Sequence, residues 1–510
     1  MAVILFEKSL RVKPVAALSL ALVAVPLLHA QEVQESSLPT APSSVLRRET
    51  KALGVPAGSG FQFKAAATEP GPQGTVIELP QNGPLRLSLD DAIALGLDRN
   101  VRLVYDRANS KVVKGYELQI ANALLPSLKV SAQTNTQEIN LAAQGFKPQS
   151  LAAFGFPPGT VHTIVKVNTT QAMISANQVL FDLPSYELYK GARREFAVVD
   201  LNTLNSRGEL VLAVGTAYLK VLADQTSLTN AQAEERAAQV LYSQADDKLK
   251  AGVGTNLDAL RAKVEYQQRQ QATVSTANQL AKDTIQLNRI MGLPANQALE
   301  LTDVAPFAEF ADMDLDRAKT TAYAHRKDLL SLQAQIEVTD RELRAAKYQR
   351  LPTLAFNGFY GVLGETTGLY HGVFNAQGSL KFPIFREAAQ RGEEQQVSGQ
   401  LTALRQREAD LRVAVESQIR TAMLDVNAAH DLVKVAQSNV DLAQQELNDE
   451  RDRFTAGVDT NLAVVDAQAS VTGANAQLVQ SLYQYNVAKL QLAQRTGVVE
   501  SSYRTYLGTK

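Results

Sequence analysis

The stretches AGVGTNL at residues 251–257 and AGVDTNL at residues 456–462 decide how this sequence folds. The second copy follows the first by 205 residues, the difference between positions 456 and 251. Ahead of the second copy, residues 386–454 contain no proline and are rich in alanine, glutamine and leucine. The glycine that follows such a run is suited to a left-handed C-cap. Each stretch is therefore predicted to be the turn of a long helical hairpin.

Other matching segments show that the repeat is more than 200 residues long and is therefore a duplicated domain. LPSL at residues 125–128 recurs as LPTL at 351–354, an offset of 226 residues (351 minus 125), so the first half carries about 21 extra residues before its turn. The similar segments LFD at 180–182 and IFR at 384–386 are 204 residues apart (384 minus 180). The insertion therefore lies upstream of LFD. The Gly- and Pro-rich stretch 140–160 is expected to hold it as a surface loop. Each half then predicts a helix, two strands, a very long helix, a tight turn and a long helix.

The segment before the second long helix alternates apolar and polar residues with a period of two, which is typical of strands. One expected strand face holds Phe374, Ala376, Gly378, Leu380 and Phe382, and the preceding strand presents Leu354, Phe356, Tyr360 and Val362. An apolar outer face with aromatic residues is typical of a membrane barrel strand, although one face of a soluble sheet gives the same pattern. Four strands per chain are fewer than the roughly eight of the smallest single-chain barrels, so several chains would share one barrel.

The long helices carry seams at heptad spacing. Apolar residues in the helix before the second turn are separated alternately by four and three residues, which keeps one side facing a partner helix. These residues are Val415, Ile419, Ala422, Val426, Ala429, Val433, Ala436, Val440, Ala443 and Leu447. The helix after the turn repeats the spacing from Val464 to Leu492, so the two are predicted to form an antiparallel coiled coil. The hairpin of the first half shows the same organisation with more polar seams.

The N-terminus has the features of a secretory signal peptide over residues 1–30. Lys8, Arg11 and Lys13 precede an apolar run at 15–28, and Ala30 offers a small residue at the cleavage point. The alternative is an N-terminal membrane anchor, for which the run is shorter than the roughly 20 residues of a spanning helix. No later run of 18 apolar residues appears, so a mature membrane protein would have to enter the bilayer as a closed barrel.

Composition argues against several function classes. The chain has 51 Lys+Arg and 52 Asp+Glu with no dense basic stripe, which disfavours nucleic-acid binding. It has no cysteine, so disulfides, thiolate metal sites and cysteine nucleophiles are excluded. The five histidines are scattered, and neither a nucleophile elbow, a P-loop nor an HExxH motif is present. No catalytic residue, metal site or cofactor is expected.

The duplicated LPSL/LPTL and AGVxTNL motifs, in this order and spacing, resemble those of the TolC-like outer-membrane efflux family. The resemblance covers residues 85–498. It implies a mostly α-helical duplicated fold, a homotrimer with a 12-stranded membrane β-barrel, and a long α-helical coiled-coil barrel in the periplasm. Such a channel would be the exit duct of a tripartite efflux or type I secretion system, working with a periplasmic membrane-fusion adaptor and an inner-membrane pump. It needs no catalytic centre because the pump supplies the energy.

The motifs also divide the chain into expected regions. Residues 31–86 are a Pro-rich leader expected to be disordered. The first repeat spans 87–295, with strands at about 127–183 and a coiled-coil hairpin at about 186–292. The second spans 296–498, with strands at about 353–385 and a hairpin at about 386–495, and residues 499–510 form a C-terminal tail. A small belt around the helices would come from about 296–316 and from the tail.

The resemblance assigns two kinds of site. The hairpin tips Gly252, Val253, Gly457 and Val458 are expected to form the periplasmic mouth and dock the adaptor, although the glycines also act as helix caps.

Candidates for the periplasmic gate are Asp258, Asp459 and Asp466. Ala463 replaces one of the family's gate acids, so an ion-paired latch of the usual form is not expected. Asp466 is expected to form a three-copy ring that attracts cations, with an ordinary solvated carboxylate as the alternative.

The main alternative to a channel is a periplasmic coiled-coil adaptor, which also has long helical hairpins. Adaptors usually carry one such hairpin, whereas this sequence predicts two and a full duplication.

Overall fold

The computed structural model describes residues 83–143, 162, 164–303, 308–310, 313–384, 386–456, 458 and 461–508. The chain divides into Met1–Glu49 and Thr50–Lys510, and all described residues belong to the second unit. The expected signal peptide, nearly all of the leader, most of the inserted loop, and the tip residues Gly457 and Asp459 lie outside the described residues.

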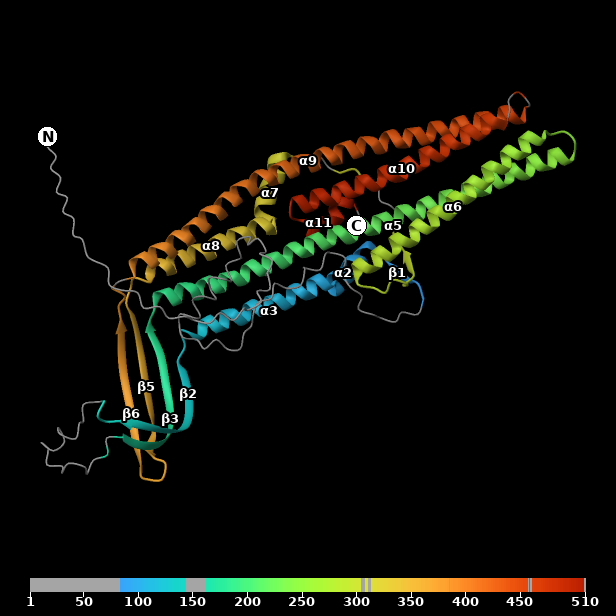
Figure 1. Ribbon diagram of the computed structural model, residues 1–510. Coiled ribbons are helices and arrows are strands. Elements are labelled where there is room, and N and C mark those ends of the chain that lie inside the picture. The colour runs from blue at the N-terminus through green and yellow to red at the C-terminus, as the bar shows by residue number, and fades with distance from the viewer. Residues whose placement is uncertain are drawn as a thin grey trace, which may run out of the picture. The chain divides into compact units, whose positions relative to one another are not determined.

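The described elements repeat one order along the chain, as Figure 1 shows. They are β1 (Leu85–Leu87), α2 (Leu89–Arg99), α3 (Val101–Asn122), β2 (Ser127–Asn140), β3 (Ile164–Phe181), α5 (Leu183–Lys250), α6 (Asn256–Met291), β4 (Leu299–Leu301), α7 (Leu315–His325), α8 (Lys327–Tyr348), β5 (Thr353–Glu365), β6 (Tyr370–Lys381), α9 (Glu387–Thr455), α10 (Asn461–Arg495) and α11 (Val499–Leu507). The series α2-α3-β2-β3-α5-α6 thus has the same order as α7-α8-β5-β6-α9-α10.

The first helix expected in each half is in fact two helices. Asn100 and Arg326 take extended backbone angles, each ending one helix and starting the next. The Asn100 side chain accepts a hydrogen bond from the Arg102 N–H at 2.9 Å, and its amide donates to the Ile290 carbonyl at 3.0 Å. Asn is a favoured N-cap residue, so the sequence indicates the break at Asn100. The break at Arg326 has no comparable signal.

The long helices begin and end where local chemistry satisfies their backbone groups. Asp182 caps α5 by accepting from the Ser185 N–H at 3.1 Å, and a proline follows in its first turn. Thr255 caps α6, which ends at Gly292 with a φ of 73°. α5 has 68 residues and α9 has 69, which at 1.5 Å per residue makes each rod roughly 100 Å long.

The four longer strands form an antiparallel sheet in the order β2-β3-β5-β6. Ile174 of β3 pairs with Val130 of β2 and with Tyr360 of β5, and Tyr360 pairs with Phe374 of β6. A bulge in β3 lies between Val179 and Phe181. The sheet leaves β2 and β6 as its two edges. Phe382, expected as the last residue of the apolar strand face, lies one residue beyond β6.

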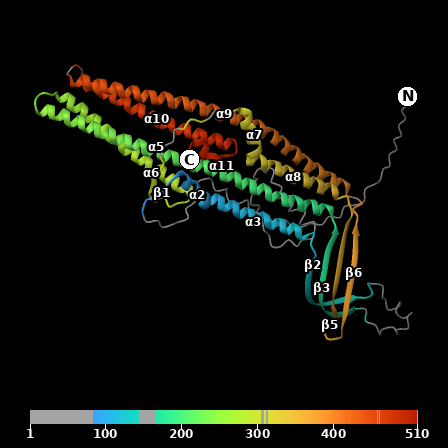
Figure 2. The ribbon, with the colours of Figure 1, turned by 180° about the vertical axis from the view of Figure 1, so that it is seen from behind.

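The helices continue the order of the strands. Next to the sheet, α3 packs on α5, α5 on α8, and α8 on α9. Farther along, the row becomes α6, α5, α10 and α9, because α5 contacts both α6 and α10, and α10 contacts α9. Figures 1 and 2 show the α5–α6 and α9–α10 hairpins extending away from the sheet on the far side of α2 and α7. In the described residues, the sheet, the helices next to it and the distal helices are therefore each a single row with two open edges.

The apolar seam expected in α9 is confirmed. All of its predicted residues are buried except Val440, which is half-buried. From Ala422 onward the seam packs on α10, through Val464, Ala467 and Val471 near the tip and through Tyr485 and Ala488 nearer the centre. Val415 and Ile419 pack instead on Ala318 and Ala322 of α7. None of the described helices is long and apolar enough to cross a membrane.

The main core joins the beginning, middle and end of the described chain. β1 pairs in parallel with β4, which links Leu85 to Leu299. The expected leader boundary at residue 86 is therefore wrong, because it falls inside a strand. The segment expected as a C-terminal tail contains helix α11, whose Tyr503 and Leu507 are buried in the main core. Three segments that are far apart in the sequence therefore pack together in this core, which corresponds to the expected belt.

Candidate functional site

One face of the sheet is apolar and exposed across all four strands. Its central row runs from Val130 through Ile174 and Tyr360 to Phe374, with exposed fractions of 76%, 53%, 70% and 79%. Leu128 and Leu380 extend the same face and are also exposed. Monomeric soluble proteins rarely expose an apolar surface of this kind, so this face is built to contact an apolar environment.

The opposite face is mostly polar. Its residues include Ser131, Gln133, Gln171, Ser175, Asn177, Asn357, Asn375, Gln377 and Ser379, which occupy the alternate positions of the four strands. The Ser379 hydroxyl donates to the Ala355 carbonyl at 3.3 Å, across β5 and β6. A sheet with an apolar outer face and a polar inner face suits the wall of a water-filled pore.

The described tip residues fit a turn that presents apolar side chains to solvent. Gly252 has a φ of 77°, and its N–H donates to the Leu249 carbonyl at 3.0 Å, which caps α5. Val253 is 79% exposed and Val458 is 73% exposed. Gly252 therefore has the capping role, and the two valines are the surface available for contact.

The gate candidates differ in what their carboxylates do. Asp258 is engaged in capping α6, because the Thr255 hydroxyl donates to it at 2.6 Å. Asp466 lies exposed on α10, away from the buried Ala467. Of the two that the structure describes, Asp466 is the more exposed, because Asp258 is half-buried.

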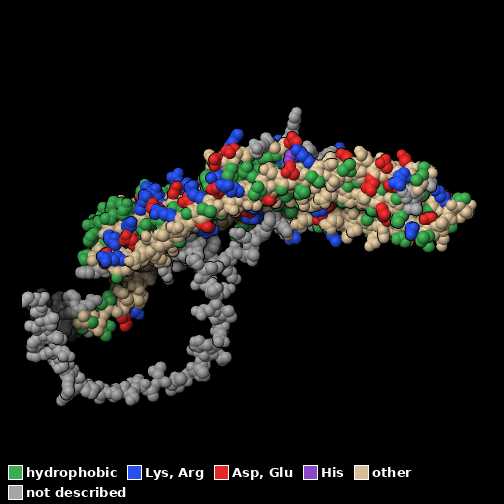
Figure 3. Space-filling view, turned by 90° about the horizontal axis from the view of Figure 1, so that it is seen from above, with side chains coloured by type: hydrophobic (Ala, Val, Ile, Leu, Met, Phe, Trp, Pro, Cys, Tyr) green, Lys and Arg blue, Asp and Glu red, His purple; other side chains and the backbone are tan. Residues whose placement is uncertain are grey.

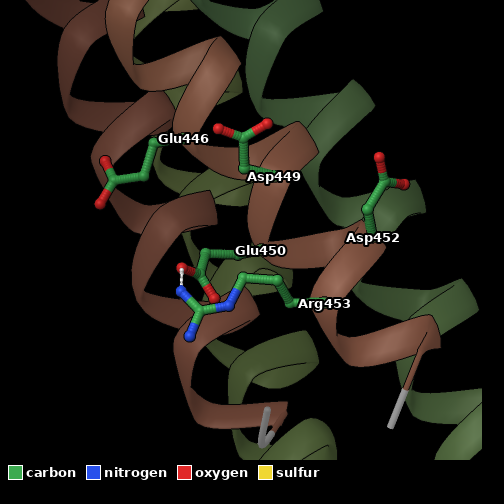
Figure 4. A pocket seen from close by; sticks show the side chains of 5 residues that line it. All are labelled: Glu446, Asp449, Glu450, Asp452 and Arg453. Carbon is green, nitrogen blue, oxygen red and sulfur yellow. Dashed lines mark hydrogen bonds and ion pairs between the residues drawn. The ribbon is translucent and has the colours of Figure 1, made fainter. Parts of the chain in front are cut away.

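An acidic hollow of about 580 Å³ lies near the end of α9. Figure 4 shows its lining residues, Glu446, Asp449, Glu450, Asp452 and Arg453, all from this one helix. Arg453 donates to the Glu450 carboxylate at 2.9 Å. The hollow is an acidic surface near the tip, and sequence reasoning did not single it out.

A second groove, of about 320 Å³, separates the two hairpins close to their turns. Leu260, Val264, Leu462 and Val465 supply its apolar lining. The side chains of α6 and α10 therefore approach each other near the tips without filling the space between them.

Two polar contacts also join the hairpins, and neither was predicted. The Lys248 ammonium of α5 lies 4.7 Å from the centre of the Phe454 ring of α9. Farther from the tips, Glu234 of α5 forms a side-chain hydrogen bond with Thr472 of α10. Residues more than 200 positions apart make these contacts, so no local pattern in the sequence could reveal them.

The described residues contain no metal-ligating cluster, and the face that Figure 3 draws has no basic patch. Among the described residues there is no group of three or more His, Asp or Glu side chains placed to hold a metal ion. Figure 3 shows acidic and basic side chains interspersed over the helices on that face of the protein, without a large patch of one sign.

Long helical hairpins that continue from a sheet with an apolar exposed face define a class of protein, the outer-membrane channels with a helical tunnel. The chain belongs to the outer membrane efflux protein family, whose model matches residues 115–293 and 320–498. The two matches correspond to the two halves of the duplication.

Curated relatives come from several bacteria. The alkaline protease secretion protein AprF of Pseudomonas aeruginosa is 22% identical over 342 residues, covering 64% of this chain and 70% of AprF. The outer membrane protein TolC of Escherichia coli is 20% identical over 360 residues, covering 66% of this chain and 71% of TolC. TolC of Vibrio cholerae is 23% identical over 390 residues, covering 74% and 83% of the two chains.

Solved structures share the fold. A membrane protein from Pseudomonas aeruginosa matches with a TM-score of 0.70 at 17% identity, covering 80% of this chain and 92% of the other. The CusC channel matches with a TM-score of 0.67 at 14% identity, covering 87% and 99% of the two chains. The Campylobacter jejuni CmeC outer membrane channel gives the same TM-score at 13% identity, covering 81% and 86%.

These findings confirm the resemblance to TolC-like proteins and the location in the outer membrane, with the helical part in the periplasm. The family consists of channel proteins and not of enzymes.

Proposed function

We propose that this chain is the protomer of a homotrimeric channel that serves as the outer-membrane exit duct of an export system. The observation that carries the proposal is the single row of elements with open edges, found both in the sheet and in the distal helices. The sheet ends in β2 and β6, and the distal helical row ends in α6 and α9. Unpaired strand edges and helix flanks are satisfied when copies of the chain join edge to edge.

The open helices carry a second apolar stripe for such a joint. On α9, Val413, Leu424, Val435 and Leu442 are exposed, and their spacing places them opposite the buried seam. On α6, Val274 and Ile285 are exposed on a side that does not include the buried Ala259 and Ala262, whereas Leu260 and Val264 near the tip line the groove toward α10 of the same chain. We assign the α9 stripe to contact with α6 of the next copy.

Three copies give a closed barrel of twelve strands, three times the four strands of this sheet. A barrel of this size has room for an open lumen, whereas eight strands enclose little more than their own side chains. The apolar face then meets lipid and the polar face lines the pore. The helical rows form the periplasmic tunnel in the same arrangement. The two repeats over 87–295 and 296–498 supply the two halves of each protomer's wall.

The test of assembly is the mass and symmetry of the protein purified from outer membranes in mild detergent. We expect a three-fold particle by cryo-electron microscopy. Val435→Glu should give monomers, because it introduces a charge into the proposed α6–α9 joint. Lys434→Gln, at the exposed neighbouring position, should leave the trimer intact. A monomeric wild-type particle would contradict the proposal.

For the partners, we propose that the hairpin tips contact a periplasmic membrane-fusion adaptor that connects the channel to an inner-membrane pump. The supporting observation is that Val253 and Val458 are apolar and exposed at the turns. Gly252 and Gly457 would shape these turns. One relative is named for alkaline protease secretion, and another, TtgF of Pseudomonas putida, is named as the outer membrane protein of a toluene efflux pump, so the proposed cargo is a protein or a small molecule.

A photo-cross-linking residue at position 253 tests the docking site in cells. We expect it to link the channel to the adaptor, and the same residue at the exposed Val240, farther from the turn on α5, to give no link. Equal linkage from both positions would remove the tips as the specific contact.

The gate proposal rests on the exposed carboxylate of Asp466, which three-fold assembly would repeat around the mouth. Asp258 and Asp459 are the other proposed gate residues. Asp466→Asn should reduce cation selectivity and blockade by multivalent cations in bilayer recordings. If both stay at the wild-type level, Asp466 is an ordinary surface carboxylate.

A further inference from the structure

A charged cluster lies where the first hairpin meets the second, well away from the tips. Lys220 and Asp224 are one turn apart on α5, and Asp283 faces them from α6. The Lys220 ammonium forms an ion pair with Asp224 and lies 3.3 Å from the Asp283 carboxylate. The Gln279 amide also donates to Asp283, at 2.9 Å. Asp283 therefore has two donors.

The Asp224 carboxylate is only partly satisfied by these donors. Asp224 is 7% exposed, and one of its oxygens meets Lys220. Its other oxygen, Oδ2, is buried and has no donor among the described residues. The two carboxylates are within hydrogen-bonding reach of each other. Two ionised carboxylates are acceptors only, so a hydrogen bond between them requires a proton.

No further charge within this cluster replaces that proton. From α10, the half-buried Tyr483 ring faces the cluster, and burial raises the pKa of its hydroxyl, so it remains neutral. The charged groups are then Lys220 from α5, with Asp224, and Asp283 from α6. With both carboxylates ionised they sum to one negative charge, and with one shared proton they sum to zero.

We propose that Asp224 and Asp283 form a proton-binding site that fastens α5 to α6 at the level where α10 packs against them. The proton lies between Asp224 and Asp283, while the Lys220 ammonium contacts one oxygen of each. No residue of this site belongs to the proposed pore or docking surfaces, so the inference stands independently of the proposed function.

The titration expected for the pair agrees with this geometry. Burial and the hydrogen bond to Asp283 raise the pKa of Asp224 to about 6. Burial acts in the same sense on Asp283, but hydrogen bonds from Asp224, Gln279 and Lys220 outweigh it and lower that pKa. The pair therefore takes up its one proton near pH 6.

The raised pKa of Asp224 makes the contact between α5 and α6 more stable at acidic pH. The folded protein binds a proton that an unfolded chain releases at about pH 3.9. Its contribution to stability is complete below that pH and is lost as the pH rises through about 6. The lowered pKa of Asp283 acts only at more acidic pH, where its own contribution is lost. Between weakly acidic and weakly alkaline pH, the titration of Asp224 therefore determines the change in stability, and the folded state becomes less stable as the pH rises.

Thermal unfolding of the full-length protein in detergent tests the proposal, followed by circular dichroism at about pH 5 and about pH 8. Asp224→Asn supplies an amide donor at every pH, so it should remove the part of the pH dependence that comes from the pair. We expect the Tm of the wild type to fall by about 2 °C more than that of Asp224→Asn over this interval. Asp246→Asn, which alters an exposed α5 ion pair with Lys250, should behave as the wild type.

A second variant and a spectroscopic measurement keep the test decisive. Asp283→Asn should also remove the pH dependence, should Asp224→Asn fail to fold. Infrared difference spectra between the two pH values should show a protonated carboxyl band in the wild type that is weaker in Asp224→Asn, because the remaining band comes from other carboxyls such as Glu342. Parallel Tm profiles for wild type and both variants, with bands of equal intensity, would overturn the proposal. So would a Tm that responds to added Na⁺ or Ca²⁺ at constant pH, since a cation would then occupy the site.

Discussion

The two hairpins arose from one repeated unit, yet different forces hold them together. In the second hairpin, the valine–alanine seam of α9 continues into the distal half of the helix. Leu447, Val464 and Val471 belong to a buried apolar cluster close to the tip. In the first hairpin, Ala238, Ala259 and Ala262 are the only described residues of that distal part to be buried.

Polar and aromatic contacts take the place of the seam in the first hairpin. Arg269 of α6 lies 3.3 Å from Glu234 of α5 and 2.7 Å from Glu265. Tyr242 and Tyr266 stack with their ring centres 6.2 Å apart. The difference teaches that the repeat conserves helix length and turn position, while the chemistry between the helices is free to diverge. The first hairpin should therefore respond to charge changes and the second to loss of volume.

The largest effect is expected from Leu447→Ala in the second hairpin. Leu447 is 2% exposed, and its truncation leaves a cavity in the distal seam. We expect a cost of about 3 kcal/mol in the local opening free energy. Hydrogen exchange of the α9 and α10 amides measures it, with Gln444→Ala on the exposed side as the control. Unchanged exchange would show that the seam does not hold this hairpin.

The corresponding change in the first hairpin is Arg269→Ala. Burial already raises the pKa of Glu234, and removing Arg269 leaves two partly buried carboxylates without their cation. We expect a cost of about 2 kcal/mol, confined to the distal parts of α5 and α6. Arg236→Ala, at an exposed position of α5, is the control. If Arg269→Ala lowers the opening free energy of the second hairpin equally, the two hairpins open as one unit and are not held by different forces.

Glu342 tests whether pH sensitivity extends beyond the first hairpin. It lies on α8, both of its carboxylate oxygens are buried without hydrogen-bond partners among the described residues, and burial together with the charge of Glu195 raises its pKa to about 8. Folding therefore favours the protonated form, and this contribution is lost as the pH rises through about 8.

Glu342→Gln should remove that loss and raise the Tm by about 1–2 °C above pH 8 relative to the wild type. Glu337→Gln, whose partner Arg194 lies across the same helix pair, is the matched control. A Tm difference that does not vary with pH would show that Glu342 is ionised in the folded protein.

The smallest effect concerns the contact between the hairpins. The Lys248–Phe454 cation–π pair is expected to contribute about 0.5 kcal/mol, as is usual for exposed pairs. A double-mutant cycle of Lys248→Met and Phe454→Leu should give this coupling in the hydrogen exchange of the tip amides. Lys250→Met combined with Phe454→Leu should show none. If the free-energy effects of Lys248→Met and Phe454→Leu are additive, the two side chains do not stabilise the contact between the tips.

Most of the architecture could be predicted from the sequence because it depends on periodic patterns. The heptad spacing from Val415 to Leu447 specified both a helix and its buried side, and the alternation around Phe374 specified a strand and its apolar side. The break at Arg326 was missed because no capping side chain marks it.

The contacts between distant segments could not be predicted in the same way. Lys248 meets Phe454 only after the two hairpins have packed on each other, and Asp224 meets Asp283 only after α6 has folded back along α5. Their residue types are common on solvated helices, and one sequence gives no means of telling these few from the many exposed ones. Helix α11 was missed for a related reason, since nine residues contain too few turns to show a period.

The belt has a consequence for the order in which the protein can fold. Tyr503 and Arg504 of α11 bind Asp90 of α2, so the hydrogen bonds that close the main core join residues more than 400 positions apart. Contacts of such long range are slow to form, because the intervening chain must first be ordered or looped out. A chain still emerging from a ribosome or a translocon lacks its last helix and cannot complete this core. The completion of this core is thereby postponed until α11 has been delivered, which suits a protein whose place of assembly is the outer membrane.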